Sequence, residues 1–416
     1  MKAFKIFLFL LILIAYHYSF GQNKALLIIL DGIPPDVMEK TPTPAIDEIS
    51  KRGAYTHAYI GGEKGTFSES PTVSAVGYNH IITGTWSHKH NVFDNKIENP
   101  NYNYWNISRM AEASDKGLKT AIFSTWEDNR TKLIGENLKA AGNIKIDYSF
   151  DGFESDTVNF PHENEDHIHK IDEHVSKEAA RYIKQEGPDL SWVYLQYTDD
   201  VGHHYGDSPE MTEAVKAADQ QVSRIWNAVK ERENSSEEKW MVIITTDHGR
   251  TSSDGKGHGG QSERERKTWI VTNYKDLNDR FKQNPSAVDI APTIVRFLNL
   301  KLPEEVAYEM DGVPLIGKVS ISNLSGKLKG EKIEINWKAL IPEGNLEIFI
   351  ATENKYSKGE ADHYTKVGTA KVNEEMYTFN FPNYKSTFYK ILVKAPHNNL
   401  NTWIVVDQAN KYLPPR

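Results

Sequence analysis

Five short apolar runs, separated by long amphipathic stretches, constrain the fold of this 416-residue chain more than any other feature. The runs are Ala25–Leu30, Thr120–Thr125, Trp192–Tyr197, Trp240–Thr246 and Trp269–Thr272. Each is nearly continuous in hydrophobicity and rich in β-branched or aromatic residues, as is typical of strands buried on both faces of a parallel sheet. Helix-like segments lie between or after them, such as Pro209–Glu231 and Ser286–Leu300. The alternation predicts an α/β fold with a mainly parallel sheet sandwiched by helices, over residues 22–316.

The hydrophobic pattern of the sequence changes after residue 316. Seven short alternating runs follow, separated by Gly, Asn and Pro. They are Lys318–Leu324, Lys332–Leu340, Leu346–Thr352, Thr365–Val372, Met376–Pro382, Thr387–Lys394 and Thr402–Asp407. This pattern predicts a small antiparallel β-sandwich over residues 317–416. With Trp337 as a candidate core residue, the segment resembles a fibronectin type III module.

Residues 1–21 have the layout of a secretory signal peptide. Lys2 and Lys5 precede an apolar run from Ile6 to Ala15, and small and polar residues follow. The apolar run is shorter than the roughly 18 residues that a membrane-spanning helix needs. We therefore predict export to the periplasm or the medium, with no transmembrane anchor after signal removal. The alternative is that the segment stays uncleaved as an anchor.

Composition excludes several kinds of chemistry. The chain has no cysteine, so thiol nucleophiles, disulfides and cysteine-ligated zinc are ruled out. Its formal net charge is −8, and no basic block is present that would follow a phosphate backbone. Binding of a nucleic-acid duplex is therefore disfavoured.

Aspartate and histidine residues follow three of the apolar runs, at the sheet edge where α/β proteins bind ligands. The six candidates are Asp31, Asp199, His203, Asp247, His248 and His258. Carboxylate oxygens and imidazole nitrogens are donors that zinc accepts. A single strand-end aspartate is often only a helix cap. Six such residues interleaved with glycines instead predict a two-metal site with open positions.

A candidate nucleophile lies between the first aspartate and the later ones. The stretch Ala75–Thr83 has the pattern of a helix, which places Ser74 near its N-terminus. The helix dipole and a nearby metal would both favour an ionised hydroxyl there. The alternative is that Thr72 and Ser74 only cap the helix.

The order of these motifs resembles the alkaline phosphatase superfamily. Asp31 comes first, then Pro71-Thr72-Val73-Ser74, Asp199-Asp200-Val201-Gly202-His203, Asp247-His248-Gly249 and Gly257-His258-Gly259. Further marks are Ile81-Ile82-Thr83-Gly84 leading to Asn95, Val288-Asp289-Ile290-Ala291-Pro292-Thr293 and Asp311-Gly312-Val313-Pro314-Leu315. Within the superfamily, the chain is most similar to the type I phosphodiesterase/nucleotide pyrophosphatase branch, although it has a serine where that branch usually has threonine.

The resemblance implies a ligand set and a mechanism. It assigns Asp199, His203 and His258 to one zinc ion. It assigns Asp31, Asp247 and His248 to a second, which the nucleophile Ser74 also contacts. Asn95 would hydrogen-bond a phosphoryl oxygen, and the reaction would pass through a phosphoserine. Asp200 and His204 flank the ligand positions and remain alternatives. The pattern ends near Leu315, so we expect the catalytic region to fold without the sandwich.

The substrate is predicted to be a small phosphate ester, and a diester or pyrophosphate is favoured over a monoester. Related monoesterases place a Lys-x-Arg pair after the second strand, where this chain has Thr125-Trp126-Glu127-Asp128-Asn129-Arg130. Acidic groups repel a dianionic monoester, and Trp126 is either a platform for a flat leaving group or a core residue. If Arg130 reaches the site, the chain is instead an alkaline phosphatase.

Two other functions are disfavoured by the residues. A sulfatase needs a Cys/Ser-x-Pro-x-Arg stretch, which Ser74-Ala75-Val76-Gly77-Tyr78 does not match. A non-catalytic binding protein would not require a complete ligand set. The C-terminal sandwich is the part that would contact glycan or a cell surface.

Overall fold

The computed structural model describes residues 22–114, 117–163, 166–380 and 386–405. The predicted signal peptide lies outside these residues, as do the last residues of the runs predicted at Met376–Pro382 and Thr402–Asp407. Within the described part of the chain, no helix is both long enough and apolar enough to cross a membrane.

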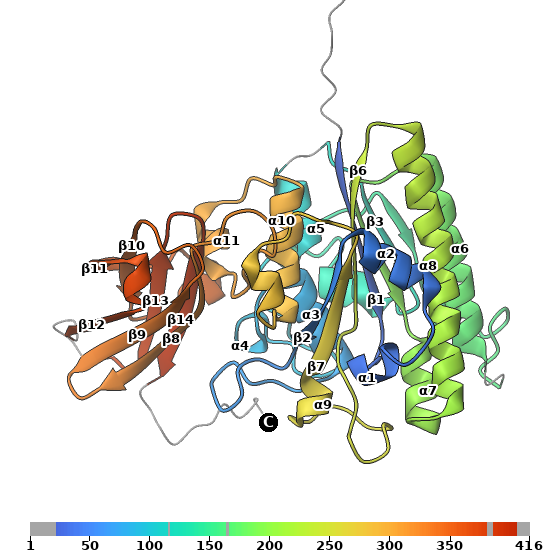
Figure 1. Cartoon of the computed structure of the whole chain (residues 1–416), viewed down its shortest axis with the longest axis horizontal. Coiled ribbons are helices and arrows are strands. Elements are labelled where there is room, and N and C mark those ends of the chain that lie inside the picture. The colour runs from blue at the N-terminus through green and yellow to red at the C-terminus, as the bar shows by residue number, and fades with distance from the viewer. Residues whose placement is uncertain (1–21, 115–116, 164–165, 381–385, 406–416) are drawn as a thin grey trace, which may run out of the picture.

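The larger part of the molecule is built on a seven-stranded sheet with the order β2-β7-β6-β1-β5-β3-β4. The strands are β1 (Asn23–Leu30), β2 (Ala54–Tyr59), β3 (Thr120–Ser124), β4 (Tyr148–Phe150), β5 (Leu190–Leu195), β6 (Lys239–Thr245) and β7 (Lys267–Thr272). Strands β6, β1, β5, β3 and β4 are parallel, whereas β7 runs antiparallel to both β6 and β2. The predicted α/β fold with a mainly parallel sheet is therefore confirmed (Figure 1).

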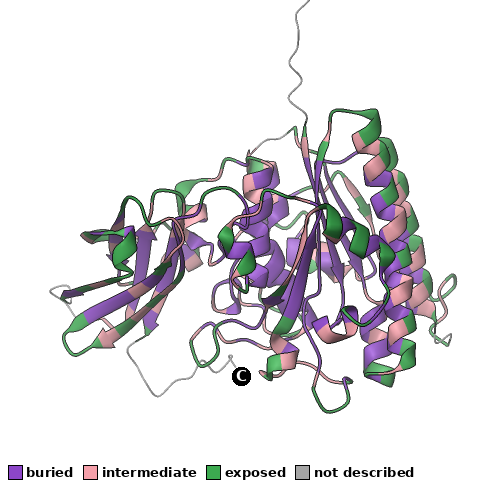
Figure 2. Cartoon of the chain, in the orientation of Figure 1, coloured by how far each residue is buried: buried purple, intermediate pink, exposed green. Residues whose placement is uncertain are grey.

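Helices cover both faces of this sheet. Their bounds are α1 (Pro35–Met38), α2 (Pro44–Arg52), α3 (Ser74–Thr83), α4 (Ser87–His90), α5 (Ile107–Ser114), α6 (His167–Glu186), α7 (Tyr197–Tyr205), α8 (Pro209–Ser235), α9 (Glu263–Arg266), α10 (Ile290–Phe297) and α11 (Glu304–Glu309). Helices α3, α5 and α10 pack on one face, and α2, α6 and α8 pack on the other. Figure 2 shows the strands buried between the two layers.

The central strand β1 shows why its sequence is apolar without a break. Ala25, Leu27 and Ile29 belong to the core under α3 and α10. The alternate residues Leu26, Ile28 and Leu30 belong to the core under α6 and α8. Because successive side chains point to opposite faces, a strand covered on both faces needs an apolar residue at every position.

The C-terminal part consists of two antiparallel sheets, as predicted. Its strands are β8 (Ile321–Lys329), β9 (Lys332–Ala339), β10 (Asn345–Ala351), β11 (Thr365–Lys371), β12 (Met376–Asn380), β13 (Phe388–Lys394) and β14 (Asn399–Val405). One sheet has the order β11-β10-β13-β14, and the other has the order β12-β9-β8. Trp337 lies in the core between them and donates a hydrogen bond to the carbonyl oxygen of Val372.

Candidate two-metal active site

The candidate nucleophile begins the helix that enters the sheet edge. Ser74 is the first residue of α3, the cap position before it is Val73, and no side chain caps the helix. The alternative that Thr72 or Ser74 serves as a cap is therefore wrong. The Ser74 side chain lies 3.4 Å from Nε2 of His248, measured from Oγ. Gly77 permits this approach, because a Cβ at that position would lie 2.6 Å from the carbonyl oxygen of Asp247.

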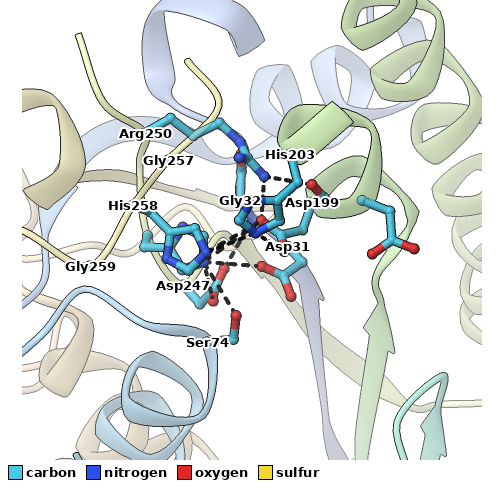
Figure 3. Close-up of polar contacts among 12 residues, drawn as sticks. Asp31, Gly32, Ser74, Asp199, His203, Asp247, Arg250, Gly257, His258 and Gly259 are labelled. Atoms are coloured by element: carbon cyan, nitrogen blue, oxygen red, sulfur yellow. Dashed lines mark hydrogen bonds and ion pairs between the residues drawn. The ribbon is translucent and has the colours of Figure 1, made fainter. Parts of the chain in front are cut away.

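A first cluster of ligand atoms forms where β1 and β6 end. Asp31, Asp247 and His248 are all buried, with exposures of 1%, 0% and 0%. Nε2 of His248 lies 3.4 Å from Oδ1 of Asp31 and 3.3 Å from Oδ2 of Asp247. These two carboxylate oxygens are buried without a hydrogen-bond partner among the described residues. The three donor atoms therefore lie close to one another. Figure 3 shows Asp31 and Asp247 of this cluster beside Ser74.

The remaining polar side-chain atoms of Asp31, Asp247 and His248 form hydrogen bonds within the protein. Oδ2 of Asp31 accepts hydrogen bonds from the hydroxyls of Tyr194, at 2.6 Å, and Tyr78. Oδ1 of Asp247 accepts one from the amide of Gly32 at 3.1 Å. Nδ1 of His248 lies 2.9 Å from the carbonyl oxygen of Gly249, which fixes Nδ1 as the protonated nitrogen and leaves Nε2 as a free electron pair.

Electrostatics of the first cluster favour a bound cation. Burial and the neighbouring charges of Asp247 and Asp199 raise the pKa of Asp31 well above its ordinary value. Burial, together with the charge of Asp199, raises the pKa of Asp247 to about 7. Burial lowers the pKa of His248, so its imidazole is neutral. A divalent cation would relieve the repulsion between these carboxylates.

A second cluster lies beside the first and is more open to solvent. Asp199 and His203 stand one turn apart on α7, and His258 comes from the loop after β6. Nε2 of His203 lies 3.2 Å from Oδ2 of Asp199 and 3.1 Å from Nε2 of His258. Nδ1 of His258 lies 2.9 Å from the carbonyl oxygen of Thr72, which turns its Nε2 toward the cluster. The side chain of His203 is 46% exposed.

Arg250 stabilises the second cluster through hydrogen bonds. Its guanidinium donates to the carbonyl oxygen of Gly32 at 2.9 Å, to that of Asp199 at 2.8 Å, and to Oδ1 of Asp199. Burial raises the pKa of Asp199, but the hydrogen bond from His203 and the charge of Arg250 outweigh it and hold the pKa below its ordinary value. Gly202 leaves room for this guanidinium, since a Cβ there would lie 2.1 Å from Cζ of Arg250.

Both donor sets suit zinc. In each cluster, three carboxylate or imidazole atoms lie within 4.8 Å of one another. Three protein donors with an open position are typical of catalytic zinc sites. The stacked rings of His248 and His258, with centroids 3.7 Å apart, join the clusters into one site. The structure thus brings all six predicted ligands and Ser74 together.

Asn95 also reaches this site, from the segment after α4. Its side-chain oxygen accepts a hydrogen bond from the amide of Ala75 at 2.9 Å, and the residue is exposed. Since Ala75 follows Ser74, the side chain of Asn95 lies next to the start of α3 and close to the nucleophile.

The alternative ligands lie outside the two clusters. His204 is exposed, and its Nδ1 lies 2.9 Å from the carbonyl oxygen of Asp200. The Asp200 carboxylate accepts a hydrogen bond from Gln196 at 3.2 Å. Trp126 packs its ring edge-to-face on Tyr78, with centroids 6.3 Å apart, so it lies close to the first cluster and against the core.

Arg130, the candidate monoester-binding cation, is occupied by carboxylates. It bonds both oxygens of Asp151, at 2.7 and 2.8 Å, and one oxygen of Glu136 at 2.7 Å. A third partner, Glu127, lies 3.1 Å away. These partners hold the guanidinium within the loops that follow β3 and β4.

Three residues of the site were missed by reasoning from the sequence, namely Tyr78, Tyr194 and Arg250. Tyr78 stands four residues after Ser74, on the same face of α3, so helical spacing could have identified it. Arg250 follows the Asp247-His248-Gly249 motif directly. Tyr194 lies within β5 and carries no comparable signal.

The fold and the paired clusters define a protein of the alkaline phosphatase superfamily. A model of the type I phosphodiesterase/nucleotide pyrophosphatase family matches residues 25–342, and the chain belongs to that family. The predicted resemblance is confirmed.

Individual relatives are distant. Human ectonucleotide pyrophosphatase/phosphodiesterase family member 5 is 25% identical over 247 residues, covering 55% of this chain and 45% of the relative. A 2,3-bisphosphoglycerate-independent phosphoglycerate mutase from Mycoplasma mycoides is 29% identical over 136 residues, covering 32% of this chain and 24% of the mutase. The chain thus spans less than half the length of these two relatives.

Solved structures support the fold alone. Ps i-CgsB in complex with k-i-k-neocarrahexaose is similar with a TM-score of 0.50 and 16% identity, over 77% of this chain and 82% of that chain.

Proposed function

We propose that the protein is a two-zinc phosphoesterase that hydrolyses phosphodiester or pyrophosphate bonds through a phosphoserine at Ser74. The observation that carries this proposal is the position of Ser74. Its hydroxyl stands at the start of α3, 3.4 Å from a ligand nitrogen of the first cluster and beside two groups of residues that could each hold a metal ion.

Asp31, Asp247 and His248 would hold one zinc ion, and Asp199, His203 and His258 the other. When bound, the two ions supply Lewis-acid stabilisation of the charge on the attacking and leaving oxygens. Ser74 attacks phosphorus in line with the leaving oxygen, and that bond breaks as the Ser74 Oγ–P bond forms. Water then hydrolyses the phosphoserine and restores the hydroxyl.

The chain itself also binds the phosphoryl group. Ser74 is the first residue of α3, and a helix N-terminus favours bound anions. The carbonyl oxygen of Asn95 is used by the amide of Ala75, so its NH2 group is the part that donates to a phosphoryl oxygen.

The charges around the site support a diester or pyrophosphate over a monoester. A monoester dianion needs cationic partners beyond the metals, and Arg130 is instead bound to Asp151 and Glu136. Trp126 lies beside Tyr78, where it can meet a flat leaving group. A monoester-specific alkaline phosphatase remains the second candidate, because both chemistries use the same two clusters.

Trapping the intermediate tests the proposed mechanism. Zinc-loaded protein is mixed with a nitrophenyl nucleotide diester, quenched in acid and digested for mass spectrometry. We expect nitrophenolate to leave and the nucleoside monophosphate to stay attached to the peptide that contains Ser74, with no adduct in Ser74→Ala. A nucleotide adduct on another residue, or turnover by Ser74→Ala at the wild-type rate, contradicts the proposal.

We also propose that residues 1–21 direct export and that residues 317–416 form a separate domain of the fibronectin type III kind. The two sheet orders described above support the second statement. Contact of this domain with glycan or a cell surface is a further prediction. N-terminal sequencing of protein recovered outside the cytoplasm tests the first, since a mature chain that begins near Gln22 is expected and one that begins at Met1 contradicts cleavage.

A further inference from the structure

The C-terminal sandwich contacts the segment that carries Asn95 at both of its ends. At the start of that segment, Lys89 of α4 is 2% exposed and donates three hydrogen bonds. Its Nζ lies 2.7 Å from the carbonyl oxygen of Glu309, 2.6 Å from Oδ1 of Asp311 and 2.8 Å from Oδ1 of Asn401 in β14. A buried ammonium with three acceptors fixes the position of the chain around it.

The other end of the segment is held by a turn of the sandwich between β10 and β11. The side-chain amides of Asn101 and Asn103 both donate to the carbonyl oxygen of Ser357, at 2.9 and 3.0 Å. The side-chain amide of Asn354 donates to the hydroxyl of Tyr104 at 3.1 Å. The Tyr104 ring also packs on Tyr356, with centroids 5.3 Å apart.

A buried lysine of the sandwich forms hydrogen bonds to residues in and near the Asn354–Ser357 turn. Lys390 in β13 is 0% exposed and bonds Oδ2 of Asp362 at 2.6 Å and Oδ1 of Asn354 at 3.2 Å. It also pairs with Glu309 of α11, the residue whose carbonyl oxygen accepts from Lys89. The two lysines therefore form one polar network across the interface, and Asn354 links that network to Tyr104.

Between the two held ends, the segment is also anchored by the core of the catalytic part, where Val92 and Ile97 are buried. The amide of Asn101 donates to the carbonyl oxygen of His90 at 2.8 Å, and the Asn91 side chain donates to the carbonyl oxygen of Asn99 at 2.7 Å. These bonds close residues 91–101 into a loop whose base rests on the sandwich. Asn95 lies within that loop and bonds the amide of Ala75, next to Ser74.

We infer that the sandwich is a positioning element of the active site: its Asn354–Ser357 turn and Asn401 hold the 91–101 loop so that Asn95 meets the start of α3. This inference rests on the proposed function. Asn354 is a positioning residue that acts through Tyr104 and the loop, and it does not touch the substrate. Small displacements of a group that holds the phosphoryl oxygens lower kcat even when the nucleophile is unchanged.

The test is a double-mutant cycle between the sandwich and the loop, in the zinc-loaded full chain. Asn354→Ala removes both bonds of the amide, and we expect kcat on a nitrophenyl nucleotide diester to fall about tenfold with zinc content unchanged. In an Asn95→Ala background the same substitution should have no further effect, because the group being positioned is gone. Asn354→Asp should restore most of the activity, since its carboxylate accepts from both Lys390 and the Tyr104 hydroxyl.

A matched control separates positioning from general damage to the sandwich. Thr378→Ala changes an exposed side chain of β12, an edge strand on the side of the sandwich away from the catalytic part (Figure 1), and should leave kcat at the wild-type value. The inference is overturned if Asn354→Ala lowers kcat equally with and without Asn95. It is also overturned if Asn354→Ala leaves kcat unchanged while Asn95→Ala lowers it.

Hydrogen–deuterium exchange distinguishes failure of this inference from failure of the proposed function. If Asn95→Ala alone has normal kcat, the proposed role of Asn95 is wrong, and exchange then decides the question of positioning. Faster exchange of the amides of residues 91–101 in Asn354→Ala, and in the milder Tyr104→Phe, supports positioning by the sandwich. Unchanged exchange in both variants overturns it.

Discussion

The Nε2 atoms of His203 and His258 face each other at 3.1 Å. Nδ1 of His258 is directed to the carbonyl oxygen of Thr72, so its Nε2 carries a lone pair when the ring is neutral. Nε2 of His203 also lies 3.2 Å from Oδ2 of Asp199. A cation between these two nitrogens and the Asp199 carboxylate would complete this geometry. The same holds for the first cluster, where two buried carboxylate oxygens have no partner among the described residues.

Metal removal is therefore expected to abolish turnover and to lower the melting temperature. Ligands that bind only the folded state stabilise it, and the buried carboxylates of the first cluster repel one another without a cation. The measurements are metal analysis, thermal unfolding and activity before and after chelation, with zinc added back. Metal-free protein with full activity contradicts the assignment of both clusters.

Substitution of the nucleophile should separate chemistry from structure. Ser74→Ala is expected to retain zinc and lose turnover by several orders of magnitude. Thr72→Ala is the comparison, because Thr72 is buried and its hydroxyl binds Gly260 at 2.8 Å and Gly259 at 3.0 Å. Thr72→Ala should lower the melting temperature because these two bonds are lost, and the variant should keep measurable turnover. If Ser74→Ala keeps turnover and Thr72→Ala loses it, the nucleophile is Thr72 and not Ser74.

The two tyrosines behind Asp31 are expected to tune metal affinity. Tyr78→Phe and Tyr194→Phe each remove one hydrogen bond to Oδ2 of Asp31, and outer partners of this kind typically affect metal affinity by about 10- to 100-fold. We expect weaker zinc binding in each single variant and a larger loss in the double variant, measured by competition with a chelator. Wild-type affinity in the double variant would contradict a role of these two tyrosines in zinc binding.

Arg130 should matter for stability and not for the choice of substrate. Arg130→Met breaks the bidentate pair with Asp151 and the bond to Glu136, so the melting temperature should fall. The ratio of diester to monoester kcat/KM should stay at the wild-type value. If monoester turnover falls selectively in this variant, Arg130 reaches the substrate and the protein is an alkaline phosphatase in the narrow sense.

The main-chain architecture and the metal ligands could be predicted because their signals are local. Each ligand follows an apolar run or stands in a short motif, and the ends of parallel strands meet at one edge of a sheet. Strands β2 and β4 were not predicted, since β2 is a half-buried edge strand and β4 has only three residues. The contact of Tyr194 with Asp31 depends on packing between distant segments, which the sequence does not encode locally.

The junction between the two parts could not be predicted for the same reason. Lys89 and Lys390 look like surface residues in the sequence but are buried in the interface. Removal of the sandwich after Gly317 would take away Asn401, an acceptor of Lys89, and would leave Glu309 without Lys390. The expectation that the catalytic region folds alone stays a prediction. The lost contacts predict that the truncated chain is less stable than the full chain.

The central claim is tested most directly by comparing kcat/KM for two substrates, a nitrophenyl nucleotide diester and a nitrophenyl phosphate monoester. Both are measured on the zinc-loaded wild type and on Ser74→Ala. The account predicts that the wild type hydrolyses the diester with the higher kcat/KM and that Ser74→Ala hydrolyses neither ester. A monoester preference of about tenfold or more, equivalent to roughly 1.4 kcal/mol in the barrier, would contradict the substrate assignment. Failure of the zinc-loaded wild type to hydrolyse either ester would contradict the function itself.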